Sequence, residues 1–358
     1  MKSQRILVVN PFGIGDVIFT LTLVEGVRKA FPDAFIGFLC NERTVEVVRL
    51  DRSVQAAYVF NRDEFRASLK EGLFSFFKKL GSLTSAIRKE RYDTLLDLSL
   101  GREFSFIAMC LGIRHRIGFN FKGRGLFLTR KRKIVSYDGA PVAEIQLSLL
   151  EDLGVTKIIP DSRLPITLPE SAKEEARTFL NKNGVDAAHP IIAVVPGGGK
   201  SWGKDALFKQ WDPAYFAQVL NALAAERPLQ ILLLGDAGEK KLLEEVAGQV
   251  RGKVLCAAGE PLSKVCALLT LTEGVVGNDG GLMHLANALG VKTVSIFGPV
   301  DERVYAPYGK ETPHEAVVEA VPCRPCYRHF YFPACPHHKR CLKDLKPEKV
   351  LLALKRIL

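Results

Sequence analysis

The chain of 358 residues has no apolar run that approaches the roughly 18–20 residues needed to span a bilayer. The N-terminal apolar run, residues 6–9, is too short for the core of a signal peptide, and no small-residue cleavage site follows it. We therefore expect a cytoplasmic protein. Hydrophobic residues make up 47% of the chain and charged residues 25%, which is the balance of a folded globular protein and not of a disordered one.

Two common signatures of nucleotide sites are incomplete. The turn at residues 13–15 lacks the third glycine of the dinucleotide motif GxGxxG, because position 18 is Ile, and Asp16 would repel a pyrophosphate. The glycine run at residues 197–199 leads into Lys200 without the GxxxxGKS or GxxxxGKT spacing of a P-loop. These departures argue against a conventional NAD or FAD enzyme and against a P-loop kinase or ATPase.

What the sequence does contain is a repeated alternation of strand and helix patterns. In the first part we expect strands at 6–10, 35–40, 56–60 and 94–98, with helices at 16–30 and 44–50. A proline-rich connection follows at 154–190, around a helix at 171–183. The alternation then restarts, with strands at 191–195, 230–234, 274–278 and 293–297 and helices at 212–227, 238–250, 282–289 and 347–358.

Two such arrays in succession predict an α/β fold with two Rossmann-like, doubly wound parallel-sheet domains that face a central cleft. We place the N-terminal domain at residues 1–165 and the C-terminal domain at 166–345. The helix at 346–358 should pack on a domain surface. A long amphipathic stretch at 64–91 carries apolar residues at near-helical spacing, and we interpret its aromatic side chains as core and not as a membrane anchor.

Charge is distributed unevenly along the chain, which has a net charge of +11. Residues 1–165 contain 26 Lys and Arg against 18 Asp and Glu, or +8, and the remainder contains 24 against 21, or +3. Residues 114–133 include eight basic residues and no acidic one. The run fits a polyanionic partner, which could be nucleic acid, an anionic membrane face or a phosphorylated substrate, or else a solvated basic face.

Three turns stand at the carboxyl ends of predicted strands, where open α/β sheets bind ligands. The first carries Asp16, as a helix cap or as a general base for an acceptor hydroxyl. The second is glycines 197–199 with Lys200, which offers backbone amides and a cation to phosphates. The third carries Asp279 and His284, which taken alone would be a helix cap and a structural histidine.

Together these turns resemble glycosyltransferase family 9, the bacterial ADP-heptose:lipopolysaccharide heptosyltransferases. The resemblance runs from Arg5 to the terminal helix, and its most specific block is Asn-Asp-x-Gly-x-Met-His at residues 278–284, which is most similar to the heptosyltransferase II subfamily. The family implies a GT-B fold and an inverting, metal-independent transfer that needs no cofactor. In agreement, the chain contains no Asp-x-Asp motif.

The resemblance also implies roles for individual residues. Asp16 takes the place of the family's catalytic base, next to Thr20. Lys200 takes the place of a lysine that binds the donor phosphates, and Asp279 that of an aspartate that holds the heptose hydroxyls. The remaining positions that correspond to donor contacts are Gly198, Gly199, Gly280, Gly281, His284 and, near the ribose, Glu239.

The resemblance gives the basic run a partner, namely the phosphates and Kdo carboxylates of an inner-core lipid A precursor. The implied acceptor contacts are Thr20, Arg102, Arg124, Arg130 and Arg132. Such an acceptor implies a peripheral contact with the cytoplasmic face of the inner membrane. Nucleic acid is not expected, because nothing supplies a reading helix or an aromatic platform.

The chain departs from the family pattern at Phe19, Thr22 and Gly280, so the acceptor and the exact sugar stay open. One alternative is a GT-B transferase that uses another nucleotide sugar. A second is a catalytically silent sugar-nucleotide-binding protein, against which the presence of both Asp16 and Lys200 argues.

Eight cysteines divide into four isolated ones, expected as buried thiols, and a cluster. The cluster has ligand types suited to structural zinc, although its second half lacks a CxxC pair, and reduced thiols are the favoured interpretation. Its members are Cys323, Cys326, Cys335 and Cys341.

Overall fold

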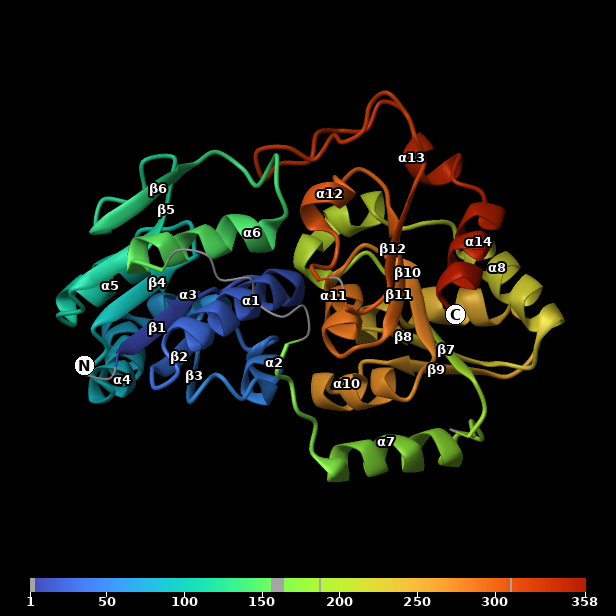
Figure 1. Ribbon diagram of the computed structural model, residues 1–358, viewed down its shortest axis with the longest axis horizontal. Coiled ribbons are helices and arrows are strands. Elements are labelled where there is room, and N and C mark those ends of the chain that lie inside the picture. The colour runs from blue at the N-terminus through green and yellow to red at the C-terminus, as the bar shows by residue number, and fades with distance from the viewer. Residues whose placement is uncertain (1–3, 156–163, 187, 310) are drawn as a thin grey trace. The chain divides into compact units, whose positions relative to one another are not determined.

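The computed structural model describes residues 4–155, 164–186, 188–309 and 311–358 (Figure 1). It divides into two compact units, Met1–Thr167 and Leu168–Leu358, each with its own six-stranded sheet. Within the predicted connection at 154–190, residues 156–163 and 187 lie outside the described part of the chain.

Unit 1 is built on a parallel sheet of order β3-β2-β1-β4-β5-β6. Its strands are β1 (Arg5–Val9), β2 (Phe35–Cys40), β3 (Ala56–Val59), β4 (Thr94–Asp97), β5 (His115–Phe121) and β6 (Arg130–Ile134). Its helices are α1 (Ile14–Ala30), α2 (Val45–Leu50), α3 (Arg62–Glu71), α4 (Leu73–Lys89), α5 (Glu103–Cys110), α6 (Val142–Leu147) and the 3-10 helix η1 (Ser148–Leu153). The central strands β1 and β4 are almost entirely buried, as expected for a parallel sheet with helices on both faces.

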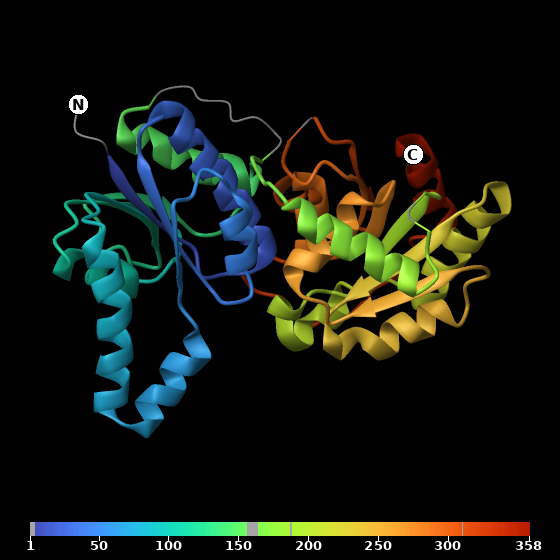
Figure 2. The ribbon, with the colours of Figure 1, turned by 90° about the horizontal axis from the view of Figure 1, so that it is seen from below.

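The stretch 64–91 forms a hairpin of two helices and not one long helix. Gly72 separates α3 from α4 with φ of 137°, a conformation that a side chain would disfavour. Phe65 and Ile87 are buried in the unit, but Leu73, Phe74 and Phe77 are exposed. Our interpretation of the aromatic side chains as core is therefore wrong for Phe77. The hairpin extends away from the sheet (Figure 2).

The basic run at 114–133 forms strands β5 and β6, which the sequence pattern did not indicate. In β6, four consecutive basic residues precede Ile134, and the strand lies at the edge of the sheet. Charged side chains on an edge strand protect it from pairing with another chain, so part of the basic run has a structural explanation.

Unit 2 repeats the plan with a parallel sheet of order β12-β11-β10-β7-β8-β9. Its strands are β7 (Ile191–Val195), β8 (Gln230–Gly235), β9 (Val254–Ala258), β10 (Gly274–Asn278), β11 (Lys292–Phe297) and β12 (His314–Val318). Its helices are α7 (Glu170–Lys182), η2 (Lys200–Phe208), α8 (Pro213–Glu226), η3 (Ala237–Glu239), α9 (Lys240–Ala247), α10 (Leu262–Thr270), α11 (Gly281–Ala288), α12 (Glu302–Tyr305), α13 (Arg340–Lys343) and α14 (Pro347–Ile357).

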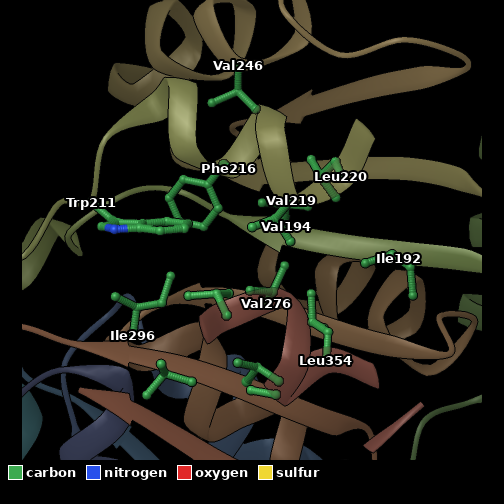
Figure 3. Packing of buried hydrophobic residues seen from close by; sticks show 14 of the residues in the cluster. Ile192, Val194, Trp211, Phe216, Val219, Leu220, Val246, Val276, Ile296 and Leu354 are labelled. Carbon is green, nitrogen blue, oxygen red and sulfur yellow. The ribbon is translucent and has the colours of Figure 1, made fainter. Parts of the chain in front are cut away.

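The core of unit 2 packs around Trp211, whose ring is fully buried beside Phe216 (Figure 3). The indole N–H of Trp211 donates to the carbonyl of Leu345 over 3.0 Å, so this large side chain is satisfied in the interior. Helix α14 buries Val350 and Leu354 in the same core and contacts α8, β11 and β12. The C-terminal helix is therefore part of the core of unit 2.

The two doubly wound sheets confirm the predicted α/β fold class. Among the described residues, no helix has both the length and the apolar character required to cross a membrane.

Candidate active site

Each parallel sheet has a topological switch point, a pair of neighbouring strands from which the chain adds later strands in opposite directions across the sheet. In unit 1 it lies between β1 and β4, and in unit 2 between β7 and β10. Loops diverge beyond the carboxyl ends of such strand pairs and leave a crevice that binds ligands in open α/β sheets. The turns that carry Asp16, the glycine run and Asp279 follow β1, β7 and β10, so each of them lies at one of the two switch points.

In unit 2, Asn278 joins the two turns at the switch point. It is fully buried at the end of β10, and its amide donates to the carbonyl of Pro196 over 2.7 Å. Its carbonyl oxygen accepts the backbone N–H of Trp211 over 3.1 Å. One side chain thus fixes the glycine turn after β7, the start of α8 and the turn after β10.

The next residue, Asp279, forms a buried ion pair with Lys209. Asp279 is 4% exposed and Lys209 is 3% exposed, and the Lys209 Nζ lies 2.6 Å from the Asp279 carboxylate. The Nε2 of His284 lies 3.8 Å from the same carboxylate. Burial opposes the charge of Asp279, but Lys209 and His284 outweigh it and hold the pKa of that carboxyl below its ordinary value. Asp279 is therefore a fixed anion next to the first turn of α11.

Sequence reasoning missed Lys209. It assigned the phosphate-binding lysine to Lys200, whose side chain lies outside the described residues. The structure instead buries Lys209 at the switch point, with its Nζ 4.5 Å from the centre of the Trp202 ring. The available signal was its place just before Asp212 and Pro213, which cap and begin α8, because a lysine there lies near the carboxyl ends of the strands.

Glu239, predicted near a ribose, lies against the glycine turn. Its carboxylate accepts the backbone N–H of Asp236 over 3.0 Å and also those of Gly198 and Gly199. A Cβ on Gly197 would come within 1.9 Å of the Glu239 carboxylate, so only glycine permits this approach. Burial raises the pKa of Glu239, although these three N–H groups oppose the shift. The amides that we expected to face phosphates therefore contact a carboxylate.

A second histidine, His314, lies close to this site and was not anticipated. It begins β12, beside Thr293 of β11. Burial, and then the neighbouring His284, lower the pKa of His314 to about 4. Among the described residues its Nε2 has no hydrogen-bond partner. A neutral imidazole therefore stands beside the charged pair at neutral pH.

In unit 1, Asp16 caps its own helix. Its carboxylate accepts the N–H of Gly13 over 3.2 Å at the start of α1. Thr20, one turn later, is fully buried, and its hydroxyl contacts Asn10 at 2.7 Å and Gln146 at 2.9 Å. A contact of Thr20 with the acceptor stays a prediction, since this hydroxyl bonds internally.

Asp97, at the end of β4, is a second carboxylate at this switch point. It is paired in the sheet with Val9 and accepts the hydroxyl of Ser99 over 2.6 Å. Burial raises its pKa to about 6, with Ser99 opposing the shift. A carboxyl of this kind changes its charge near neutral pH, and sequence reasoning did not single it out.

The predicted acceptor-binding arginines divide between the carboxyl ends and the amino ends of the strands. Arg102 caps α5 after β4 and Arg124 follows β5, so both lie toward the carboxyl edge with Asp16, and both are exposed. Arg130 begins β6 at the opposite edge and donates to the backbone carbonyl of Asp152. These positions leave Arg102 and Arg124 as the candidates for contact with an acceptor near Asp16.

Arg132 is also engaged within unit 1. Its guanidinium lies 2.5 Å from the carboxylate of Asp152 and 2.9 Å from that of Glu151. Two carboxylates satisfy this cation and tie the edge strand β6 to η1. A contact of Arg132 with the acceptor stays a prediction, since both of these ion pairs are formed within unit 1.

The suggested zinc site in the cysteine cluster is not supported. The four cysteines are free, and within the described residues no three or more His, Cys, Asp or Glu side chains are grouped so that they could hold a metal ion. Burial raises the pKa of the Cys341 thiol to about 11.

With this geometry in place, the chain can be compared with known proteins. The model of glycosyltransferase family 9 (heptosyltransferase) matches residues 80–330. Lipopolysaccharide heptosyltransferase 3 of Escherichia coli is 25% identical over 299 residues, which cover 82% of this chain and 83% of that protein.

Two solved structures share the fold. The glycosyltransferase family 9 protein from Veillonella parvula DSM 2008 has a TM-score of 0.81 at 20% identity, with 99% of this chain and 97% of that chain covered. The E. coli ADP-heptose LPS heptosyltransferase II has a TM-score of 0.75 at 20% identity, with 99% and 98% covered. The predicted GT-B fold class is thereby confirmed. Because the family match extends over more than half of its length, the chain belongs to glycosyltransferase family 9, the heptosyltransferases, and is a glycosyltransferase.

Proposed function

We propose that the protein transfers heptose from ADP-heptose to the inner core of a lipopolysaccharide precursor, with inversion and without a metal. The observation that carries the proposal is the buried pair of Lys209 and Asp279 at the N-terminus of α11. A nucleotide sugar presents a diphosphate beside sugar hydroxyls, and this pair presents a cation beside a hydroxyl-binding anion. The names of the heptosyltransferases compared above supply the donor and the acceptor class.

In this proposal unit 2 binds the donor. Asp279 accepts hydrogen bonds from the heptose hydroxyls, and Lys209 attracts the diphosphate together with Lys200. The N-terminus of α11, with Gly280 and Gly281, adds its partial positive charge and backbone N–H groups. His284 and the neutral His314 would complete the wall of the site. The cation and the helix terminus would stabilise the negative charge that develops on the leaving ADP.

Glu239 would contribute to the same site through the ribose. A carboxylate near a nucleotide accepts the ribose hydroxyls, and Glu239 follows β8, next to the glycine turn. The structure gives it three backbone donors, so donor binding would exchange some of these for hydroxyl groups. Gly198 and Gly199 would then turn their N–H groups toward the donor.

Unit 1 would supply the base and the acceptor contacts. Asp16 would take the proton from an acceptor hydroxyl as its oxygen attacks the anomeric carbon and the bond to the diphosphate breaks on the opposite face. Attack from that side inverts the anomeric configuration. Arg102 and Arg124 would attract phosphate or Kdo carboxylate groups of the acceptor. A lipid A-linked acceptor would bring the enzyme to the cytoplasmic face of the inner membrane.

The test is turnover with ADP-heptose, UDP-sugars and GDP-sugars against truncated lipopolysaccharide cores. We expect transfer only from ADP-heptose and full activity in EDTA. Transfer from another nucleotide sugar would replace the donor assignment, and donor binding without any turnover would indicate a silent binding protein. Loss of activity in EDTA that Mg²⁺ restores would overturn the metal-independent mechanism.

A further inference from the structure

The helical hairpin of α3 and α4 carries an apolar tip that nothing in unit 1 covers. Phe74 is 84% exposed, Leu73 is 66% exposed and Phe77 is 60% exposed, all within the first two turns of α4. Leu69, at the end of α3, is exposed beside them. The backbone of this hairpin projects from the sheet (Figure 2). Single exposed apolar residues are ordinary, but four at the end of one hairpin are of the kind that marks an interaction site.

The exposure is not a consequence of poor packing, because the inner face of the hairpin is packed through aromatic contacts. Phe65 and Phe76 contact each other edge to face with ring centroids 6.0 Å apart, and Phe65 stacks on Phe60 at 4.7 Å. Ile87 anchors the far end of α4 in the core. Helix α4 therefore has one apolar face that packs against unit 1 and a second apolar face, in its first two turns, that is exposed to solvent.

Cationic side chains border the tip. The hairpin segment 62–89 has seven Lys and Arg against three Asp and Glu, a net charge of +4. Asp63 pairs with Arg66 at 4.0 Å, and Glu64 pairs with Lys79 at 2.6 Å. Within the described part of the chain, Lys70 and Lys78 form no ion pair. Lysines that flank a small apolar patch can hold their charges at an anionic surface while the apolar residues enter it.

We propose that this tip, Leu69, Leu73, Phe74 and Phe77 with Lys70 and Lys78, docks on an anionic lipid surface. The inference rests on the proposed function, in which the acceptor is held in a membrane by its lipid. Charge complementarity selects the occupant, since the net positive hairpin attracts anionic headgroups. A second copy of the chain would bring the same positive charge to the contact and is disfavoured.

The experiment measures sedimentation of the full-length protein with vesicles. Wild type should bind phosphatidylglycerol–phosphatidylethanolamine vesicles and bind phosphatidylcholine vesicles weakly. Phe74→Ser/Phe77→Ser should lower binding by about tenfold or more, because two phenylalanines no longer enter the interface. Lys70→Gln/Lys78→Gln should lower it by roughly tenfold on the anionic vesicles only. Leu352→Ser, which removes an exposed leucine from α14, is the matched control and should bind as wild type.

Three further measurements make the result decisive. Circular dichroism and the midpoint of urea unfolding identify a variant that fails to fold, in which case Phe74→Ser alone, at the most exposed position, takes its place. Sedimentation equilibrium tests the other occupant: dimers in wild type that the Phe74→Ser/Phe77→Ser variant abolishes would overturn the proposal, as would unchanged vesicle binding of that variant.

Transfer from ADP-heptose to a deacylated core acceptor separates this proposal from the function. The tip variants should match wild type on that acceptor and fall behind only when the acceptor is embedded in vesicles. No transfer by wild type to any acceptor would refute the function. Equal transfer by wild type and tip variants to the embedded acceptor would refute the docking surface.

Discussion

Replacing Lys209 by Met tests whether the buried charge pair organises the site of unit 2. The substitution keeps the length and apolar stem of the side chain but removes the cation 2.6 Å from Asp279. At that separation two unit charges attract by about 6 kcal/mol at an effective dielectric constant of about 20. Part of this attraction offsets the cost of burying both charges, so the loss on removing one partner should be about 3–5 kcal/mol.

The matched control is Lys173→Met. Lys173 pairs with Glu170 at the same separation of 2.6 Å, but the two side chains are 32% and 78% exposed. Exposed pairs contribute about 0–1 kcal/mol, so this variant should be nearly as stable as wild type. The double variant Lys209→Met/Asp279→Asn should recover much of the stability lost by Lys209→Met alone, because no buried charge is left unpaired.

Urea unfolding monitored by tryptophan fluorescence measures the free energies, and calorimetric titration with ADP measures donor affinity. In Lys209→Met, burial of Asp279 is opposed by fewer groups, so its pKa should rise and the instability should shrink as the pH falls toward that pKa. ADP affinity should fall at least tenfold, whereas Lys173→Met should leave it unchanged. A loss below about 1 kcal/mol in Lys209→Met, equal to that of the control, would refute the reasoning.

Three further predictions address unit 1. Asp16→Asn should lower turnover by roughly 10²–10⁴ while ADP affinity stays within a few-fold, and a variant that keeps a tenth of its turnover would exclude a general base. Arg102→Gln/Arg124→Gln should raise the acceptor KM but not the donor KM, whereas Arg130→Gln, at the opposite edge, should change neither; steady-state kinetics decide this. Asp97→Asn should alter the pH dependence of stability: Asp97 has a pKa of about 6 when folded and about 3.9 when unfolded, so between these values only the folded chain keeps the proton and wild-type stability falls as the pH rises. The variant should lack this decline and gain up to about 3 kcal/mol over wild type by pH 7 in urea unfolding, and parallel curves would show that Asp97 ionises normally.

The fold was predictable from the sequence wherever strands are apolar. The runs that became β1, β7 and β10 lie buried on both faces, so they read as short uninterrupted apolar segments between turn residues. The edge strand β6 could not be found in this way, because its exposed position allows Arg130 to Lys133 to be charged. Four consecutive cations do not predict a strand, and the segment is a strand because it pairs with β5.

The burial of the aromatic side chains in the hairpin of α3 and α4 was mispredicted for a related reason. Phe74, Phe76 and Phe77 are equally apolar in the sequence, but Phe74 and Phe77 are exposed whereas Phe76 contacts Phe65. Helical spacing identified the amphipathic pattern but could not show that the first turns of α4 lie beyond the sheet. The buried face was therefore assigned to too many residues.

The turns that form the candidate site were predictable from the sequence, but the side chains that contact each other there were not. Asp279 and the glycine run follow strands that a sequence reveals, and their convergence at one switch point is a consequence of parallel strand order. Lys209 lies seventy residues before Asp279; its place just before the start of α8 indicates a position near the strand ends but not a contact with Asp279. Only the tertiary fold shows that Lys209 is buried against Asp279.

The burial of that lysine is itself an argument for function. An ion pair at 3–4% exposure stabilises a fold little, and apolar residues of similar volume usually do as well or better. Asn278 already joins the glycine turn, α8 and β10 through neutral hydrogen bonds, so the architecture does not need the charges. What the pair adds is a cation and an anion fixed side by side with most of their desolvation cost already met, next to the N-terminus of a helix. A ligand with a diphosphate and hydroxyl groups close together would bind well to that arrangement. If the pair serves binding and not folding, the double variant Lys209→Met/Asp279→Asn should keep most of the wild-type free energy of unfolding while its affinity for ADP falls.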